Sequence, residues 1–300
     1  MQTKGPHMRI ALAQLYPKLG DLSGNLQTHL DLMHQAAAQG AELVVFPELS
    51  LTGYYLRDLM VEVATPTNGA VFQQLCAVSR ELKLDVMVGF VEPDRRGQFY
   101  IAAAYISLGE IQHVHRKVYL PTYAMFDDAR FFAYGDQLRA FDTRFGRMGM
   151  LICEDFWHIS TSYVLWADGA DLLLLHSASP GRGLSQGAAL ETSRWVNRLL
   201  ETMGALYTVP VVHCNRVGFE DGQIFWGGSS MVDPDGHWLL QGPSFDEALL
   251  IQDLDLQQTQ RSRRQAMLLR DERPDLTLRE LQRIMTADPQ KSFGPLPPKP

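Results

Sequence analysis

The chain has 300 residues, of which 46% are apolar and 20% are charged, and its formal net charge is −7. These values fit an ordinary soluble globular protein and exclude a disordered or fibrous chain. The negative charge gives no electrostatic footprint for nucleic acid or for an acidic membrane, so we expect neither as a partner.

The cysteine count indicates a reducing compartment. Cys76, Cys153 and Cys214 form an odd set without short spacing, which predicts neither a disulfide framework nor a metal site of the CxxC type. No apolar run reaches the length of about 18 residues that a membrane helix needs. We therefore expect a cytoplasmic protein.

The chain begins with a segment that we exclude from the fold. Residues 1–7 resemble the remnant of an expression tag, because Gly5-Pro6-His7 is typical of a protease and cloning scar. From Met8 the pattern predicts a strand over residues 8–15, a helix ending at Gly40 and a strand over 42–46. A helix over 69–83 and strands over 85–91, 99–107 and 111–117 follow. Gly109 and Glu110 predict a two-residue hairpin turn between the last two strands.

The second half returns to alternating strands and helices. The expected order is a strand ending at Cys153, a helix over 161–168, a strand over 171–175, a helix through 190–203 and a strand over 209–212. Residues 222–240 predict two strands around a turn at 233–236. Beyond residue 256 we expect short helices near 267–270 and 276–285 and an extended end at 293–300. Strands and helices mixed in both halves predict an α/β fold with two sheets inside and helices outside.

Three of the predicted strands each end in a reactive side chain. They present Glu48, Lys117 and Cys153. A lone cysteine is usually a buried apolar residue, as we expect for Cys76 and Cys214. Together, however, a carboxylate can take a thiol proton, an ammonium can attract a developing oxyanion, and the thiolate can attack a carbonyl carbon. The three groups therefore predict one nucleophilic site.

At these residues the chain resembles the nitrilase, or carbon-nitrogen hydrolase, superfamily, which has a Glu-Lys-Cys triad in this order. The segments 116–132 and 153–157 look most like the glutaminase domain of glutamine-dependent NAD synthetases. The resemblance implies a four-layer α-β-β-α sandwich of the nitrilase type, with a catalytic domain over 8–255. It also implies that the tail over 256–300 could pack on a dimer partner, within a homodimer or higher homo-oligomer.

The resemblance extends to residues around the triad. It places Asp128 where the family has a second glutamate that supports the lysine, although Asp127 and Asp128 would equally serve as helix caps. Glu154 follows the cysteine, and its backbone N–H is a candidate oxyanion donor. Tyr123 and Trp157 are candidate walls of a substrate pocket. This chemistry requires neither a metal nor another cofactor.

The predicted substrate loop departs from the glutaminase pattern. Ser179 and Pro180 match the family, but Ser185 stands where a basic residue holds the α-carboxylate of glutamine. Arg182 is the candidate replacement.

Four candidate functions follow from these residues. We expect an amidase that cleaves a small carboxamide through a thioester and releases ammonia. The alternatives are a glutaminase subunit supplying ammonia to a separate synthetase such as NAD synthetase, or a nitrilase. A non-enzymatic binding protein ranks last, because it would not need all three triad residues.

Overall fold

The computed structural model describes residues 7–182 and 190–287. It contains two six-stranded sheets and one two-stranded sheet. The first sheet has the order β14 (Ala248–Asp255), β1 (His7–Gln14), β2 (Leu43–Val45), β3 (Asp85–Pro93), β4 (Phe99–Ser107) and β5 (Glu110–Arg116). The second has the order β13 (Trp238–Gln241), β12 (Ser230–Val232), β9 (Val211–Asn215), β8 (Leu172–Ser177), β7 (Gly146–Ile152) and β6 (Phe141–Thr143). The small sheet pairs β10 (Val217–Glu220) with β11 (Gln223–Trp226).

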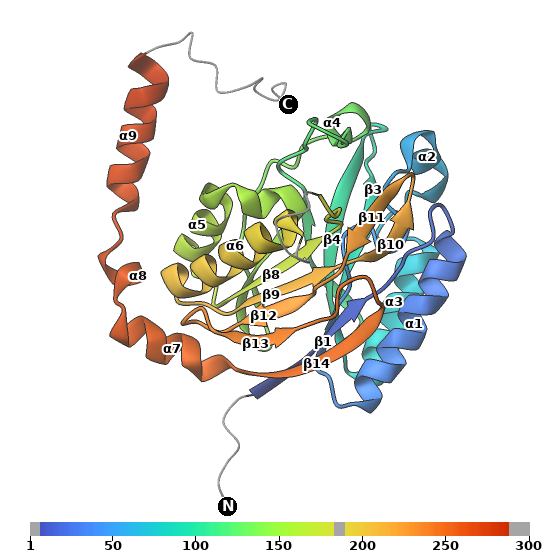
Figure 1. The fold of residues 1–300 in the computed structure, drawn as a ribbon, viewed down its shortest axis with the longest axis horizontal. Helices are drawn as coiled ribbons and strands as arrows, with labels where there is room; N and C mark the ends of the chain where they lie inside the picture. Colours follow the sequence, from blue (N-terminus) through green and yellow to red (C-terminus); the bar gives the residue numbers. More distant parts are fainter. Residues whose placement is uncertain (1–6, 183–189, 288–300) are drawn as a thin grey trace, which may run out of the picture.

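Helices cover the outer face of each large sheet (Figure 1). The first sheet is covered by α1 (Leu22–Ala38) and α3 (Ala70–Leu82), and the second by α5 (Ile159–Ala167) and α6 (Glu191–Tyr207). The short helices are α2 (Met60–Val63) and α4 (Asp128–Phe131), with 3-10 turns η1 (Arg57–Leu59) and η2 (Cys153–Trp157). A third apolar cluster, which includes Ile10, Met87 and Met150, lies between the two sheets. The predicted α-β-β-α sandwich is confirmed.

Strand direction brings the ends of β2 and β5 to the same end of the first sheet. Strands β1, β2 and β3 run parallel, as do β7, β8 and β9. Strand β5 has the same direction as β3, because both are antiparallel to β4, which lies between them. The residues that follow β2 and β5 therefore leave the first sheet at the same end, the carboxyl end of its parallel strands. Open α/β sheets place their ligand sites at this end.

One predicted turn and one predicted strand differ from the structure, whereas the predicted turn at 233–236 joins β12 to β13. The β4–β5 hairpin turns at Leu108 and Gly109, one residue earlier than expected, with φ angles of 50° and 86°. Two central residues with positive φ match the twist of the paired strands. The long strand expected after residue 222 is interrupted by Gly227 and Gly228 at φ 72° and 64°. This interruption assigns β11 to the small sheet and β12 to the second large sheet.

The C-terminal segment forms helices α7 (Leu256–Gln265), α8 (Leu268–Asp271) and α9 (Pro274–Ala287). Helix α7 contacts the second sheet through an ion pair between Arg263 and Asp171, the residue before β8. Helix α9 projects away from the body and exposes Leu278 and Leu281 (Figure 1). The predicted packing of this tail on a dimer partner stays a prediction, and residues 293–300 lie outside the described part. No helix among the described residues is long and apolar enough to cross a membrane.

Three fully buried histidines predict a strong loss of stability in mild acid. Burial lowers the pKa of His29 to about 4 and those of His176 and His213 to about 3. In the unfolded chain each would titrate near 6.5, so the stabilisation is complete above that pH and is lost as the pH falls toward 4. Each histidine contributes a slope of about 1.4 kcal/mol per pH unit. Urea unfolding between about pH 7.5 and pH 5 measures this slope. His29→Gln should reduce the slope by the contribution of one histidine, about 1.4 kcal/mol per pH unit. A free energy of unfolding that does not change over this pH range would contradict the account.

Candidate active site

Glu48 lies in the loop that follows β2 and is fully buried. Its Oε1 accepts a hydrogen bond from Lys117 Nζ at 2.7 Å, and its Oε2 accepts one from the backbone N–H of Ala178 at 2.7 Å. Ala178 follows β8 in the second sheet. The carboxylate of Glu48 therefore links the ends of β2 and β5 in the first sheet to the end of β8 in the second.

Lys117 is the first residue after β5, and its ammonium is buried between two carboxylates. Its Nζ donates to Glu48 and, at 2.8 Å, to Asp128 Oδ2. Asp128 also accepts a hydrogen bond of 2.6 Å from the hydroxyl of Tyr54. Asp127 makes no side-chain cap bond to α4. Of the two readings of Asp128, the geometry favours support of the lysine over helix capping.

Cys153 is the first residue of η2, where β7 ends. Its φ is +46°, a left-handed conformation that is uncommon for residues other than glycine. Its residue surface is only 6% exposed. Burial and the charge of Glu48 raise the pKa of its thiol well above the ordinary value, and the charge of Lys117 opposes them. The thiol is therefore neutral at rest, and the charges of Glu48 and Lys117 both act on it.

The remaining pKa values describe an ammonium beside a proton acceptor. Burial alone would lower the pKa of Lys117, but the carboxylates of Asp128 and Glu48 together raise it well above its ordinary value. Burial raises the pKa of Glu48, although Lys117 opposes this shift. Such a carboxylate is a stronger base than an exposed one, which suits the abstraction of a proton from a neutral thiol.

Asp155 ties the cysteine turn to the lysine segment. Its Oδ1 accepts from the backbone N–H groups of Val118 and Tyr119, both at 2.9 Å. Its Oδ2 accepts from the N–H of Ile152 at 3.1 Å and lies 2.9 Å from His115 Nε2. One fully buried carboxylate thus fixes the residue before Cys153 and the residues after Lys117.

A polar cluster surrounds the side chain of Glu154. The hydroxyl of Tyr123 donates to Glu154 Oε2 at 3.0 Å, and the guanidinium of Arg182 lies 5.7 Å from the Tyr123 ring. The charge of Glu154 also raises the pKa of Cys153, after the effects of burial and Glu48. The structure therefore brings Tyr123, Glu154 and Arg182 together near the triad. Ser185 lies outside the described residues.

The other two predicted pocket residues occupy different surroundings. Ser179 is buried just after β8, with its backbone N–H bonded to Asn215 Oδ1 at 2.9 Å, one residue beyond the contact to Glu48. Trp157 stacks on Phe156 and lines a small cavity with Leu199 of α6. This packing places the Trp157 ring toward α6.

Sequence reasoning did not single out Tyr54, Asp155 or Glu220. Tyr54 and Asp155 bond directly to site residues or to their neighbours, and Glu220 holds the backbone of Tyr54. Asp155 carried a signal, since it lies two residues after the cysteine. The partners of Tyr54 and Glu220 are distant in the chain, so no local pattern identifies them.

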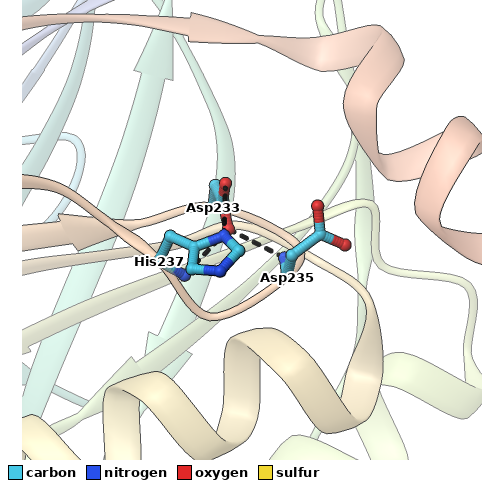
Figure 2. Close-up of side chains that lie close together, drawn as sticks. All are labelled: Asp233, Asp235 and His237. Atoms are coloured by element: carbon cyan, nitrogen blue, oxygen red, sulfur yellow. Dashed lines mark hydrogen bonds and ion pairs between the residues drawn. The ribbon is translucent and has the colours of Figure 1, made fainter.

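A second polar cluster lies on the β12–β13 turn (Figure 2). Asp233, Asp235 and His237 place potential metal ligands within 4.8 Å of one another. However, Asp233 Oδ1 accepts the backbone N–H groups of Asp235 and His237 at 2.8 and 2.9 Å. Gln258 of α7 donates to Asp233 Oδ2 at 2.9 Å, and Ser262 donates to Asp235 at 2.8 Å. These bonds organise the turn and dock α7.

The family model for carbon-nitrogen hydrolases matches residues 9–264. The chain belongs to the carbon-nitrogen hydrolase family. This confirms the predicted resemblance and an enzyme of the type that cleaves C–N bonds other than peptide bonds.

This carbon-nitrogen hydrolase is similar both to NAD(+) synthetases and to amidases. The glutamine-dependent NAD(+) synthetase of Thermotoga maritima is 35% identical over 261 residues, which cover 85% of this chain and 43% of that protein. An (R)-stereoselective amidase of Pseudomonas sp. is 31% identical over 268 residues, which cover 89% of this chain and 92% of the amidase. The chain thus spans less than half the length of the matched NAD(+) synthetase and nearly all of the amidase.

A solved amidase has the same fold. A mutant of the amidase from Nesterenkonia sp. AN1, with the acetamide moiety of fluoroacetamide added covalently at its active site cysteine, has a TM-score of 0.77 and 26% identity to this hydrolase. The match covers 93% of this chain and 98% of the amidase.

Gly89 on β3 offers a test of how the Glu48 loop is seated. A Cβ atom at this position would lie 2.5 Å from both Leu49 N and Pro47 O. Gly89→Ala is therefore expected to displace the Glu48 backbone, reduce the unfolding free energy by about 1–3 kcal/mol and reduce activity. Gly97→Ala is the control for activity. A Cβ at this exposed position meets nothing within 4 Å, so the strain expected from its φ of +77° should lower stability without changing turnover. Urea unfolding and turnover measurements compare the two variants, and equal turnover would contradict the seating.

Proposed function

We propose that this carbon-nitrogen hydrolase is a cysteine amidohydrolase that cleaves a small carboxamide through a thioester and releases ammonia. The observation that carries the proposal is the buried Glu48–Lys117 pair, with both charges acting on the thiol of Cys153. Base, cation and nucleophile are the groups that acyl transfer to a thiol requires.

In the first half-reaction Glu48 takes the proton from Cys153 Sγ, and the sulfur attacks the amide carbon. The oxyanion accepts hydrogen bonds from Lys117 Nζ and from the backbone N–H of Glu154. Glu48 then donates its proton to the leaving nitrogen, the C–N bond breaks, and ammonia departs from the thioester.

In the second half-reaction Glu48 takes a proton from water, and the hydroxide attacks the thioester carbon. The C–S bond breaks, Glu48 returns the proton to the sulfur, and a carboxylic acid is released. Asp128 compensates the charge of Lys117 throughout, because its carboxylate accepts a 2.8 Å bond from the ammonium.

The second part of the proposal is the substrate. We expect a small amide other than glutamine, since Ser185 replaces the base that holds the α-carboxylate in the glutaminase pattern. A buried carboxylate without a cationic partner is costly. Glu154 suits an ammonium group on the substrate, with Tyr123 beside it, unless Arg182 supplies the missing cation.

The second candidate is a glutaminase that supplies ammonia to a separate synthetase. Its support is the 35% identity to a glutamine-dependent NAD(+) synthetase. A nitrilase remains a third candidate, because the same three residues can serve the hydrolysis of a C≡N group.

Ammonia release from a panel of amides, nitriles, carbamoyl compounds and glutamine tests these candidates. The proposal expects the highest kcat/KM for an amide other than glutamine. A kcat/KM for glutamine well above all others, lost in Arg182→Ala, would replace the first candidate by the second. Turnover of nitriles alone would favour the third.

A further inference from the structure

Glu220, at the end of β10, is a buried carboxylate that holds the loop following Glu48. Its Oε1 accepts the backbone N–H groups of Tyr54 at 2.8 Å and Tyr55 at 2.6 Å. Its Oε2 accepts a hydrogen bond from Arg216 Nη1 at 2.7 Å. Arg216 is fully buried, and its guanidinium lies 4.1 Å from the ring centre of Phe225. A residue far along the chain therefore fixes this loop.

The Arg216–Glu220 ion pair is a poor device for stability alone. Burying two charges costs free energy that their mutual attraction returns only in part, so an apolar pair of similar volume would often be at least as stable. The pair instead fixes the orientation of the loop, because one oxygen of Glu220 accepts hydrogen bonds from two successive backbone N–H groups. Gly53, with φ +81°, permits the close approach, since a Cβ there would lie 3.0 Å from Glu220 Oε2.

The held loop reaches the candidate active site through one side chain. The Tyr54 hydroxyl donates to Asp128 Oδ1 at 2.6 Å, while Asp128 Oδ2 accepts from Lys117 Nζ at 2.8 Å. Lys117 also donates to Glu48 Oε1 at 2.7 Å. Two carboxylates therefore accept hydrogen bonds from one ammonium. The orientation of Asp128 determines whether Lys117 bonds to both carboxylates or to Glu48 alone.

We propose that Glu220 is a positioning residue that, through Tyr54, keeps Asp128 on Lys117 and so preserves Glu48 as the proton acceptor. The inference rests on the role of Glu48 in the proposed function. If Asp128 turned away, Lys117 would pair with Glu48 alone.

The sign of the effect follows from the charges around Glu48. Burial raises the pKa of Glu48, Lys117 lowers it, and Asp128 raises it again. Loss of the Asp128 contribution leaves Glu48 with a lower pKa and hence a weaker base. Proton transfer from Cys153 then slows, and the acidic limb of the pH profile moves to lower pH.

The rate at which iodoacetamide alkylates Cys153 tests this directly in the full chain. Peptide mass mapping locates the modified cysteine, and the reaction needs no physiological substrate, so it stays informative if the amidase proposal fails. Tyr54→Phe removes the hydroxyl and leaves the ion pair, whereas Glu220→Gln removes the charge. We expect each variant to slow alkylation about tenfold, the effect of one charge-assisted hydrogen bond, and to move the acidic limb to lower pH.

The double variant separates a shared path from two independent effects. If Glu220 acts through Tyr54, Tyr54→Phe combined with Glu220→Gln should be about as slow as the slower single variant. Rates that multiply would overturn the proposal. If Glu220→Gln fails to fold, Arg216→Met combined with Glu220→Gln removes both charges and takes its place in the comparison.

Tyr105→Phe is the matched control. Its hydroxyl donates to a buried carboxylate, Asp85 Oδ2, at 2.8 Å, but Asp85 begins β3 at the end of the sheet opposite to Glu48. This variant should leave the alkylation rate and its pH profile unchanged. A Tyr54→Phe protein that behaves like Tyr105→Phe would overturn the proposal.

Discussion

Cys153→Ala is expected to lower turnover of the best amide at least ~10⁴-fold while the protein remains folded, because no other group can form the thioester. The substitution removes only a sulfur atom, so stability should change little. Ammonia release under saturating substrate measures the effect, with circular dichroism as a check of the fold.

Cys76→Ala controls for general effects of removing a thiol. Cys76 is half-buried on α3, and burial raises the pKa of its thiol. We expect this variant to keep full activity. Near-normal hydrolysis by Cys153→Ala would instead show that water attacks the amide without a covalent intermediate.

Lys117→Met should produce the second large loss, of at least ~10²–10³-fold in kcat, because it removes the proposed oxyanion donor and the cation bound to Glu48. It also leaves the carboxylates of Glu48 and Asp128 buried without a cation, which is expected to cost about 3–5 kcal/mol of stability. Turnover and urea unfolding measure the two effects.

The double variant Lys117→Met with Asp128→Asn distinguishes the two effects. Removing one carboxylate with the ammonium should restore part of the stability, but activity should stay low. If activity recovers together with stability, Lys117 would be a structural residue, and the oxyanion would need another donor.

The sequence was sufficient to place Glu48, Lys117 and Cys153 close to the ends of strands, because each follows a clear apolar pattern. They lie just past β2, β5 and β7, and parallel direction brings the ends of β2 and β5 to one end of the first sheet. The four-layer sandwich followed from the same alternation of strands and helices and from the family resemblance.

The bonds that hold these ends were not predictable from local pattern. The Tyr54–Glu220 bond spans 166 residues, and Asp155 bonds to the segment that follows β5 of the other sheet. The position of Asp128 also depends on the three-dimensional arrangement. Its backbone N–H donates to Pro121 O at 3.1 Å, and its Oδ2 accepts a hydrogen bond from Lys117 Nζ at 2.8 Å. Such contacts depend on packing between distant elements, which composition and periodicity do not encode.

The most direct test of the mechanism is mass spectrometry of the protein quenched in acid during turnover of its best amide. We predict that the chain gains the mass of the substrate minus ammonia, and that digestion places this acyl group on the peptide containing Cys153. Two results would contradict the account. One is ammonia release at full rate by Cys153→Ala without any adduct, and the other is an acyl group found on Cys76 or Cys214 of the unsubstituted protein.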